Sequence, residues 1–321
     1  MDEEPLVSII TCTYNRAHLL PRAINSILNQ TYTNYELLIV DDGSTDNTRE
    51  NMKAFQDERI KYHRHECNRG VLAAKNTGFN LAKGKYLCTL DDDDVFLPGT
   101  LEIAVKTLER LSTQGIKILW SDCIDAESEQ FSNTRRQEGI VAYEEFLCNK
   151  VIGDYFNMFE RSLLGSLRWD ERLWGWESIP LLKLARISPI YYIPQTLMRT
   201  YRLHGERVSD PLSRLNKIPR IILTLQVFLN EFGSEIQPLC PKYYAQLLAS
   251  LGYYQLLIGE KREGRKVLSE SLKNSFSFKI FLRYFSSFVL NKSQTIYLYK
   301  TNYSFYTFRQ KIGSLIRKKH G

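Results

Sequence analysis

The chain has 321 residues, of which 43% are hydrophobic and 25% charged, so it can bury one large core or two modest ones. Its six cysteines include no Cys-x-x-Cys pair, which argues against a zinc site, and no stretch approaches the eighteen uncharged apolar residues of a membrane-spanning helix. The formal net charge of +7 is uneven, because residues 261–321 hold fourteen Lys or Arg against two Glu.

The acidic N-terminal residues lack the apolar segment of a secretory signal, so we expect a cytoplasmic protein. The first 120 residues alternate between short apolar runs and amphipathic segments. Helices are expected over residues 19–28 and 71–83 and directly after Pro98, which stands as at a first helical position. Five runs predict β-strands: 7–12, 35–40, 60–64, 86–90 and 116–120. Strands alternating with helices predict βαβ units and an α/β fold with a mostly parallel sheet.

Polar residues follow three of these strands, at the edge where parallel sheets bind ligands. Residues 14–16 follow the first strand, Asp41 and Asp42 follow the second, and residues 91–94 follow the fourth. This co-location predicts a functional site. No Gly-x-Gly-x-x-Gly follows the first strand and no Gly-x-x-x-x-Gly-Lys-Ser/Thr occurs, so a dinucleotide-dependent oxidoreductase or a P-loop enzyme is disfavoured.

Residues 91–94 are four consecutive aspartates after a buried strand. Two like charges about 4 Å apart repel by on the order of 4 kcal/mol at an effective dielectric near 20. A divalent cation explains the run economically, since oxygen ligands on a loop suit Mg²⁺ or Mn²⁺. A hydrated acidic turn is the alternative, because surface turns favour Asp.

Four segments carry a resemblance to a known family: Val-Ser-Ile-Ile leading to Thr-Tyr-Asn-Arg (7–16), Leu-Ile-Val-Asp-Asp-Gly-Ser-Thr-Asp (38–46), Asn-Arg-Gly with Ala-Lys-Asn-Thr-Gly (68–78), and Leu-Asp-Asp-Asp-Asp (90–94). In this order they resemble the family-2 glycosyltransferases of GT-A fold. The resemblance implies a Rossmann-like GT-A catalytic domain over residues 1–211, followed by a helical, basic region over residues 212–321. It also implies inverting transfer of a sugar from a nucleotide-diphosphate sugar, with UDP favoured, to a hydroxyl of a saccharide or glycolipid acceptor.

The resemblance assigns nucleotide-sugar binding to the strand ends. Tyr14 lies where the family stacks a ring on the base, although a core tyrosine is the alternative. Asp42 lies where the family accepts a hydrogen bond from the base, while Asp41 is expected to hold the turn or the ribose; which of the two contacts the base stays open. The complete implied set is Thr13, Tyr14, Asn15, Arg16, Asp42, Arg69, Lys75, Asp91 and Asp92.

Lys75 stands where the family usually has arginine, and it is a point charge without the arginine fork. Lys75 is expected to pair with Asp91 or with a phosphate, and Arg69 is a second candidate for the diphosphate. For either residue a plain surface cation is the alternative.

Asp91 and Asp93 match the acidic positions of the family's Asp-x-Asp motif, so Mn²⁺ or Mg²⁺ is assigned to Asp93 directly, and Asp91 is assigned to the ribose hydroxyl or to the metal through water. Asp92 and Asp94 are then expected to fill the run, and a backbone turn is the alternative role for Asp94. His204 is the third candidate metal ligand or a contact to the diphosphate, and a structural histidine is the alternative.

The acceptor half departs from the family's pattern. The aspartate that usually deprotonates the acceptor hydroxyl is replaced by Ser178, and serine without a partner is no base at neutral pH. Glu177 is therefore assigned as the catalytic base, with Asp170 second. A non-catalytic nucleotide-sugar-binding or scaffold protein is the competing hypothesis.

The region after residue 212 is expected to be all helical, with a single tetratricopeptide-like hairpin over residues 243–272. Residues 276–308 contain twelve Phe or Tyr interleaved with Lys and Arg, which suits an anionic membrane surface. Helices packed on the catalytic domain with a hydrated basic face are the alternative. We expect a peripheral position on the inner face of the cell membrane, and no nucleic-acid partner, because an aspartate-lined rim repels phosphate backbones.

Overall fold

The structure is a computed structural model that describes residues 4–173, 178–201 and 215–297. The chain divides into two compact units, which are treated separately. The first comprises Met1–Arg172 and Trp176–Gly205, and the second comprises Glu206–Gly321 with Leu173–Gly175. The break between Gly205 and Glu206 lies outside the described residues, so the predicted domain boundary at residue 211 stays a prediction. In the described part of the chain, no helix combines the length and the apolar character needed to cross a bilayer.

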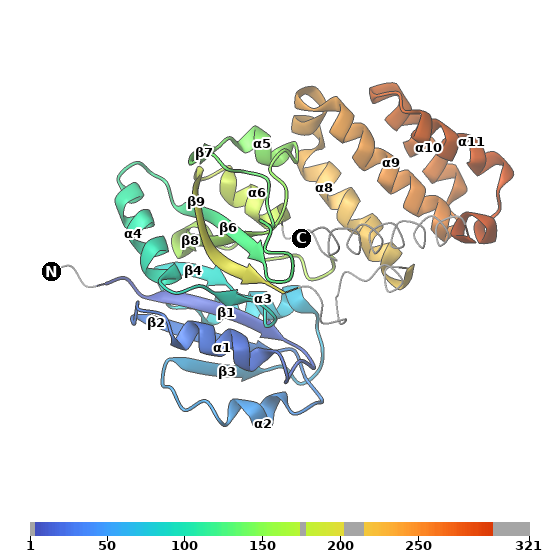
Figure 1. Ribbon diagram of the computed structural model, residues 1–321. Helices are drawn as coiled ribbons and strands as arrows, with labels where there is room; N and C mark the ends of the chain where they lie inside the picture. The colour runs from blue at the N-terminus through green and yellow to red at the C-terminus, as the bar shows by residue number, and fades with distance from the viewer. Residues whose placement is uncertain (1–3, 174–177, 202–214, 298–321) are drawn as a thin grey trace, which may run out of the picture. The chain divides into compact units, whose positions relative to one another are not determined.

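Nine strands form one mixed sheet in the first unit (Figure 1): β1 (Val7–Thr13), β2 (Tyr35–Asp41), β3 (Ile60–Arg64), β4 (Tyr86–Thr89), β5 (Val95–Phe96), β6 (Ile118–Asp125), β7 (Gly139–Val141), β8 (Tyr155–Glu160) and β9 (Ile190–Thr200). Their order is β3-β2-β1-β4-β8-β6-β9-β5, and β7 also pairs with β9. The α/β architecture is as predicted, and its parallel part comprises β3, β2, β1 and β4 together with the β6–β9 pair. β8 runs antiparallel to both β4 and β6, which makes the sheet mixed.

Helices connect the strands of the first unit: α1 (Leu20–Leu28), α2 (Thr48–Met52), α3 (Val71–Leu81), α4 (Thr100–Ser112), α5 (Tyr143–Leu147) and α6 (Ser178–Ala185). The prediction that Pro98 occupies a first helical position is wrong, since α4 begins at Thr100. Gly99 has a φ of +79°, a left-handed conformation, so the helix can start only after it. Pro98 belongs to the turn before the helix.

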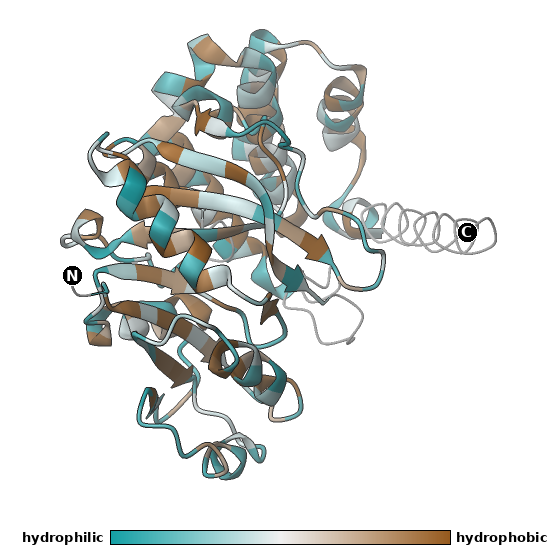
Figure 2. Cartoon of the chain, turned by 60° about the vertical axis from the view of Figure 1, so that its left-hand side comes forward, coloured by the Kyte–Doolittle hydropathy of each residue, from teal (hydrophilic) through white to brown (hydrophobic). Residues whose placement is uncertain are grey.

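The two faces of the sheet are covered by different helices. Ile9 and Ile10 are adjacent in β1, so their side chains point to opposite faces. Ile9 belongs to a core cluster with Ile24 of α1 and Val105 of α4, whereas Ile10 contacts Gly78 of α3. Figure 2 shows the strands largely in the brown of hydrophobic residues, as expected for a sheet covered on both faces.

The second unit is helical in its described residues: α8 (Ile218–Leu239), α9 (Pro241–Ile258), α10 (Lys261–Asn274) and α11 (Phe278–Val289). The predicted hairpin within residues 243–272 is formed by α9 and α10, which approach closely where two glycines face each other. A Cβ on Gly252 would lie 2.8 Å from the carbonyl oxygen of Gly264, and a Cβ on Gly264 would lie 2.8 Å from that of Gly252. Larger residues at these positions would force the two helices apart.

Candidate active site

The loops after β1, β2 and β4 meet at the carboxyl edge of the sheet. β1 pairs in parallel with β2 and β4, so the three strands end side by side. A guanidinium nitrogen of Arg16, after β1, lies 2.7 Å from a carboxylate oxygen of Asp92 and 3.0 Å from one of Asp93, both after β4. Asn15 accepts a hydrogen bond of 2.7 Å from the backbone N–H of Thr45, after β2. The three polar clusters therefore lie together, as the strand positions predicted.

Two arginines hold the aspartate loop in place. Arg22, on α1, donates a hydrogen bond of 2.5 Å to the backbone carbonyl of Asp93, and its guanidinium lies 3.5 Å from the ring centre of Tyr201. The N–H of Tyr201 donates to the Asp94 carboxylate at 3.0 Å. Burial alone would lower the pKa of Arg16, but the neighbouring carboxylates raise it overall, so Arg16 stays charged.

Asp91, Asp93 and Asp94 each offer one carboxylate oxygen to a common point, and these oxygens lie within 4.8 Å of one another. Burial, reinforced by the charges of Asp91 and Asp93, raises the pKa of Asp94 to about 8. Burial also raises the pKa of Asp92 to about 6, although Arg16 opposes the shift. A divalent cation would relieve this crowding, and an all-oxygen donor set fits Mg²⁺ or Mn²⁺.

Asp94 is a candidate ligand that the sequence analysis did not assign. Its backbone N–H donates to the carbonyl of Asp91 at 3.1 Å, so it does form a turn, but its carboxylate joins the cluster as well. The signal available in the sequence was the unbroken run of four aspartates. The third predicted ligand, His204, lies outside the described residues.

Asn15 and Asp46 join the loops that follow β1 and β2. Asn15 has a left-handed φ of 54°, a conformation that asparagine tolerates better than most residues. Its backbone N–H donates to the hydroxyl of Ser44 at 2.8 Å. Asp46 accepts from the N–H of Thr48 at the start of α2 and also from the N–H of Ala17. The edge is thus a connected framework of hydrogen bonds.

Asp42 is buried, and both of its carboxylate oxygens accept hydrogen bonds. One oxygen binds the N–H of Arg69 at 2.9 Å and lies 2.8 Å from a ring nitrogen of His65, and the other binds the N–H of Gly70 at 2.7 Å. The opposite ring nitrogen of His65 lies 2.9 Å from the Thr77 hydroxyl. Asp42 therefore holds the backbone that leads into α3, a role the sequence did not reveal. Its contact with a base stays a prediction.

The residues around Asp42 differ in exposure. Thr13 closes β1 opposite Asp41, and Asp41 is fully buried, accepting from the N–H of Ser44 at 2.8 Å. This is the turn-holding role expected of Asp41. Tyr14 is 43% exposed, which leaves a ring face open for stacking. Gly43 has a φ of +80°, and a Cβ there would lie 2.7 Å from the backbone of the loop after β3, so glycine is required.

The two predicted diphosphate cations lie in different surroundings. Lys75, on α3, is buried, and its amino group lies 3.8 Å from a carboxylate oxygen of Asp91. Pairing with Asp91 was one of the alternatives for Lys75. The side chain of Arg69 is half exposed and donates to Glu171 at 3.2 Å. Lys75 thus faces the aspartate cluster, and Arg69 contacts the segment that carries the acceptor-side residues.

The side chain of Asn76 connects the acceptor-side segment, residues 169–171, to α3. The side chain of Asn76 donates to the carbonyl of Trp169 and accepts from its N–H, both at 2.8 Å. The same side chain donates to Glu171 at 3.1 Å. The indole of Trp169 packs on Phe79 with 4.5 Å between ring centroids. Residues 169–171 are therefore fixed to the helix that carries Lys75.

Of the two candidate bases, the structure describes only Asp170. Asp170 receives two hydrogen bonds from the guanidinium of Arg172, at 2.9 and 2.6 Å, and these lower the pKa of Asp170. A lowered pKa makes a carboxylate a weaker general base. Glu177 lies outside the described residues. Ser178 is the first described residue of α6.

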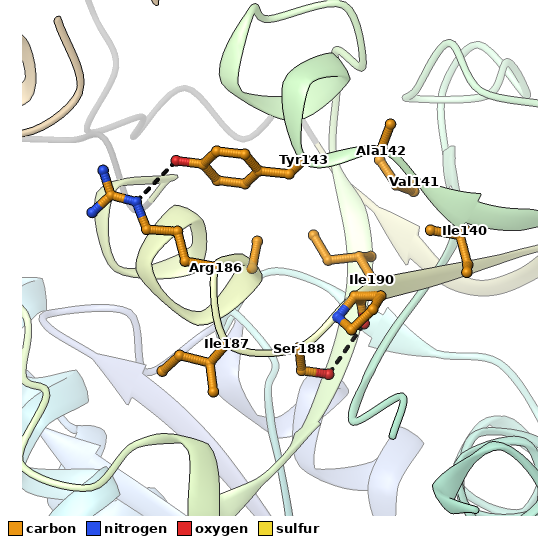
Figure 3. A pocket seen from close by; sticks show the side chains of 10 residues that line it. Ile140, Val141, Ala142, Tyr143, Arg186, Ile187, Ser188 and Ile190 are labelled. Atoms are coloured by element: carbon orange, nitrogen blue, oxygen red, sulfur yellow. Dashed lines mark hydrogen bonds between the residues drawn. The ribbon is translucent and has the colours of Figure 1, made fainter. Parts of the chain in front are cut away.

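A cavity of 240 Å³ lies elsewhere in the first unit, beside the start of β9 (Figure 3). Arg186 donates to the phenol oxygen of Tyr143 at 3.0 Å at its rim. The other lining side chains are mainly apolar: Ile140, Val141, Ala142, Ala185, Ile187, Ser188, Pro189 and Ile190. It shares no residue with the carboxyl edge and lacks its carboxylates.

Comparison with known proteins agrees with this geometry. The family model described as Glycosyl transferase family 2 matches residues 8–164. An uncharacterized glycosyltransferase of Haemophilus influenzae is 38% identical over 263 residues, which cover 74% of this chain and 78% of that protein. The Escherichia coli UDP-Glc:alpha-D-GlcNAc-diphosphoundecaprenol beta-1,3-glucosyltransferase WfgD is 29% identical over 236 residues, which cover 66% of this chain and 90% of that protein.

A solved structure shares the fold. The crystal structure of Staphylococcus aureus TarS 1-349 in complex with UDP-GlcNAc superposes with a TM-score of 0.59 at 16% identity, covering 84% of this chain and 88% of that one. At this identity the likeness concerns the fold alone. The family model and the sequence relatives identify the chain as a glycosyltransferase that belongs to glycosyl transferase family 2.

Proposed function

We propose that the chain transfers a sugar, with inversion, from a UDP-sugar to a hydroxyl of a lipid-linked saccharide. The observation that carries the proposal is the crowded cluster of Asp91, Asp93 and Asp94 beside the cations of Arg16 and Lys75. The Escherichia coli relative supports both substrate classes, because its name specifies a UDP-sugar donor and a diphosphoundecaprenol acceptor. A cytoplasmic, peripheral position at the cell membrane is part of the proposal.

The donor binds, in this proposal, with its base towards Tyr14 and its diphosphate towards the aspartate cluster. The exposed ring of Tyr14 supplies the stacking surface, and Asp42 the hydrogen-bond acceptor for the base. Asp91, Asp93 and Asp94 would hold Mn²⁺ or Mg²⁺, which when bound neutralises negative charge on a diphosphate. Arg16 and Lys75 add positive charge at fixed positions on the same edge.

Transfer requires one bond to form as another breaks. The acceptor oxygen bonds to the anomeric carbon of the sugar, and the bond from that carbon to the diphosphate oxygen breaks, so UDP leaves with the electron pair. Glu177 takes the proton of the acceptor hydroxyl, with Asp170 as the second candidate. A single displacement from the opposite face inverts the anomeric configuration.

The test is release of UDP by the purified full-length chain. We expect one UDP-sugar from a panel to give Mn²⁺-dependent release of UDP, and a lipid-diphosphate-linked saccharide to accelerate it. GDP- and dTDP-sugars, assayed by release of GDP and dTDP, serve as the comparison and should give no release. Analysis of the anomeric configuration of the product checks inversion. Absence of release with every donor, metal and acceptor would contradict the proposal.

A non-catalytic nucleotide-sugar-binding or scaffold protein is the second candidate, favoured by Ser178 at the start of α6 where the family's base is usual. Isothermal titration calorimetry separates the two. Donor binding in the presence of Mn²⁺ without UDP release under any condition would favour the second candidate.

A further inference from the structure

An apolar surface lies along α11 in the second unit. Phe278, Phe281, Phe285 and Val289 are 66%, 40%, 60% and 72% exposed. Their positions at i, i+3, i+7 and i+11 place them on one side of the helix, and Leu282, 49% exposed, lies beside them. The rings of Phe281 and Phe285 stack with 6.4 Å between centroids. These five residues are called the α11 apolar face.

The opposite side of α11 is anchored, so the α11 apolar face has a fixed direction within the second unit. Ile280 is buried in a cluster with Leu256 of α9 and Leu268 of α10. Arg265 donates to the carbonyl of Ser287 at 2.6 Å, and the amino group of Lys261 donates to the carbonyl of Leu290 at 3.0 Å. Cations from α10 therefore hold the last turn of α11, where the helix dipole is negative.

The charge on α11 is of one sign, and the charge of the neighbouring residues is predominantly positive. The sequence of α11 contains Lys279 and Arg283 and no acidic residue. Residues 261–297 contain eight Lys or Arg against two Glu. On α10, the exposed cations include Arg262, Lys266 and Lys273. An occupant of this face must therefore tolerate or attract positive charge.

We infer that the α11 apolar face docks into the surface of an anionic phospholipid membrane. Helices with one aromatic and aliphatic side and basic polar residues lie in the plane of such a surface, with the apolar side about 5–10 Å deep in the headgroup and acyl boundary. Anionic lipids attract the flanking Lys and Arg side chains. The inference rests on the proposed function for its purpose, because a lipid-linked acceptor is met at a membrane.

A second copy of the chain fits the face less well. In a symmetric dimer the same patch contacts itself, so the α11 cations of both copies would be brought together. No carboxylate of α11 is available to compensate them. A lipid surface supplies the missing negative charge, and therefore satisfies both the apolar and the electrostatic character of the face.

The test compares two matched double variants of the full-length chain. F278S/F285S removes two phenylalanines of the face, while the control I140S/I187S removes two isoleucines of similar exposure (56% and 66%) in the first unit. The assay is co-sedimentation with vesicles of phosphatidylglycerol and phosphatidylcholine. We expect the wild type and the control to bind alike, and F278S/F285S to bind at least about tenfold more weakly. Vesicles of phosphatidylcholine alone should bind the wild type more weakly.

Three results would overturn the docking proposal. They are absence of wild-type binding, equal binding by F278S/F285S, and conversion of a wild-type dimer to a monomer by F278S/F285S in sedimentation velocity. Circular dichroism melting checks that both variants fold. UDP release measured without membranes tests the proposed function separately. A chain that binds vesicles but releases no UDP would support the docking proposal and contradict the proposed activity. A chain that releases UDP but does not bind vesicles would support the activity and contradict the docking proposal.

Discussion

Glu36 and Asp94 are both buried carboxylates of the first unit, yet they lie at opposite edges of the sheet and in opposite surroundings. Glu36, at the amino end of β2, accepts hydrogen bonds of 2.6 Å from the hydroxyl of Ser8, the amino group of Lys61 and the backbone N–H of Lys83. Although burial alone would raise its pKa, these donors lower the pKa of Glu36 overall. Asp94 has one backbone donor, and burial and nearby carboxylates raise its pKa to about 8.

This difference in hydrogen-bond donors and in pKa distinguishes a carboxylate that stabilises the fold from carboxylates that are expected to bind a ligand. A buried anion with three donors, one of them a cation, is compensated by the protein itself, so it stabilises the fold. Crowded anions that keep a raised pKa are compensated incompletely, which costs stability unless a cation or substrate is bound. Variants at the two edges should therefore respond in opposite ways.

The largest effect is expected from D93N at the carboxyl edge. Asparagine is nearly isosteric and can still accept from Arg16, so the fold should be retained while one anionic ligand is lost. We expect Mn²⁺-dependent UDP release to fall by about 10³-fold, since removal of electrostatic stabilisation at a reacting group has costs of this order. Turnover equal to that of the wild type would remove the proposed role of Asp93.

The assigned base is tested next, by E177Q. Loss of general-base catalysis should lower the transfer rate by about 10²-fold or more, with little change in donor affinity. S178A serves as the neighbouring control and should retain wild-type transfer. If D170N rather than E177Q lowers the rate, the assignment of the base is reversed.

E36Q should destabilise the fold without affecting chemistry. Its amide would place N–H groups against donors, so we expect a loss of about 2 kcal/mol in the free energy of unfolding. D94N, measured without metal, should be neutral or stabilising, because asparagine replaces a carboxyl whose ionisation is opposed in the folded state by burial and by the neighbouring carboxylates. Urea denaturation of both variants checks the opposite signs, and equal destabilisation by both would break the comparison.

The smallest predicted effect is the change with pH in the free energy of unfolding that is lost in E36Q. Because the pKa of Glu36 is lowered on folding, its stabilisation is fully present above the unfolded pKa of about 4.3 and is lost as the pH falls through the folded pKa. The gap between wild type and E36Q should therefore be largest near neutral pH and narrow in acid. A gap that widens in acid would contradict this account.

The sequence predicted the parts of the fold that follow local rules. The strands ending at Thr13, Asp41 and Thr89 are short apolar runs between amphipathic helices, and their parallel order follows from that alternation. The antiparallel insertion of β8 between β4 and β6 was not predicted. Its partners are distant in the chain, such as Cys88 opposite Met158, so pairing is decided by tertiary packing rather than by a turn.

The candidate site was predictable where a residue sits at a strand end and less so where its role depends on contacts from elsewhere. Arg16 and Asp93 were found because they follow β1 and β4. Arg22 looks like an ordinary helix-surface charge in the sequence, and only the folded chain brings it to the backbone of Asp93 and the ring of Tyr201. The structural role of Asp42 likewise depends on a loop 27 residues further along the chain.

Lys75 and Asn76 are neighbours on α3, and they face two different substrates in the proposed reaction. The amino group of Lys75 lies near Asp91 on the donor side, and the side chain of Asn76 makes two hydrogen bonds to the backbone of Trp169 on the acceptor side. Because the two residues are adjacent on one helix, any movement of α3 would also move the acceptor segment, which the side-chain amide of Asn76 holds by two hydrogen bonds. A displacement of this helix would shift the donor-side cation and the acceptor-side segment together and so preserve the distance between them.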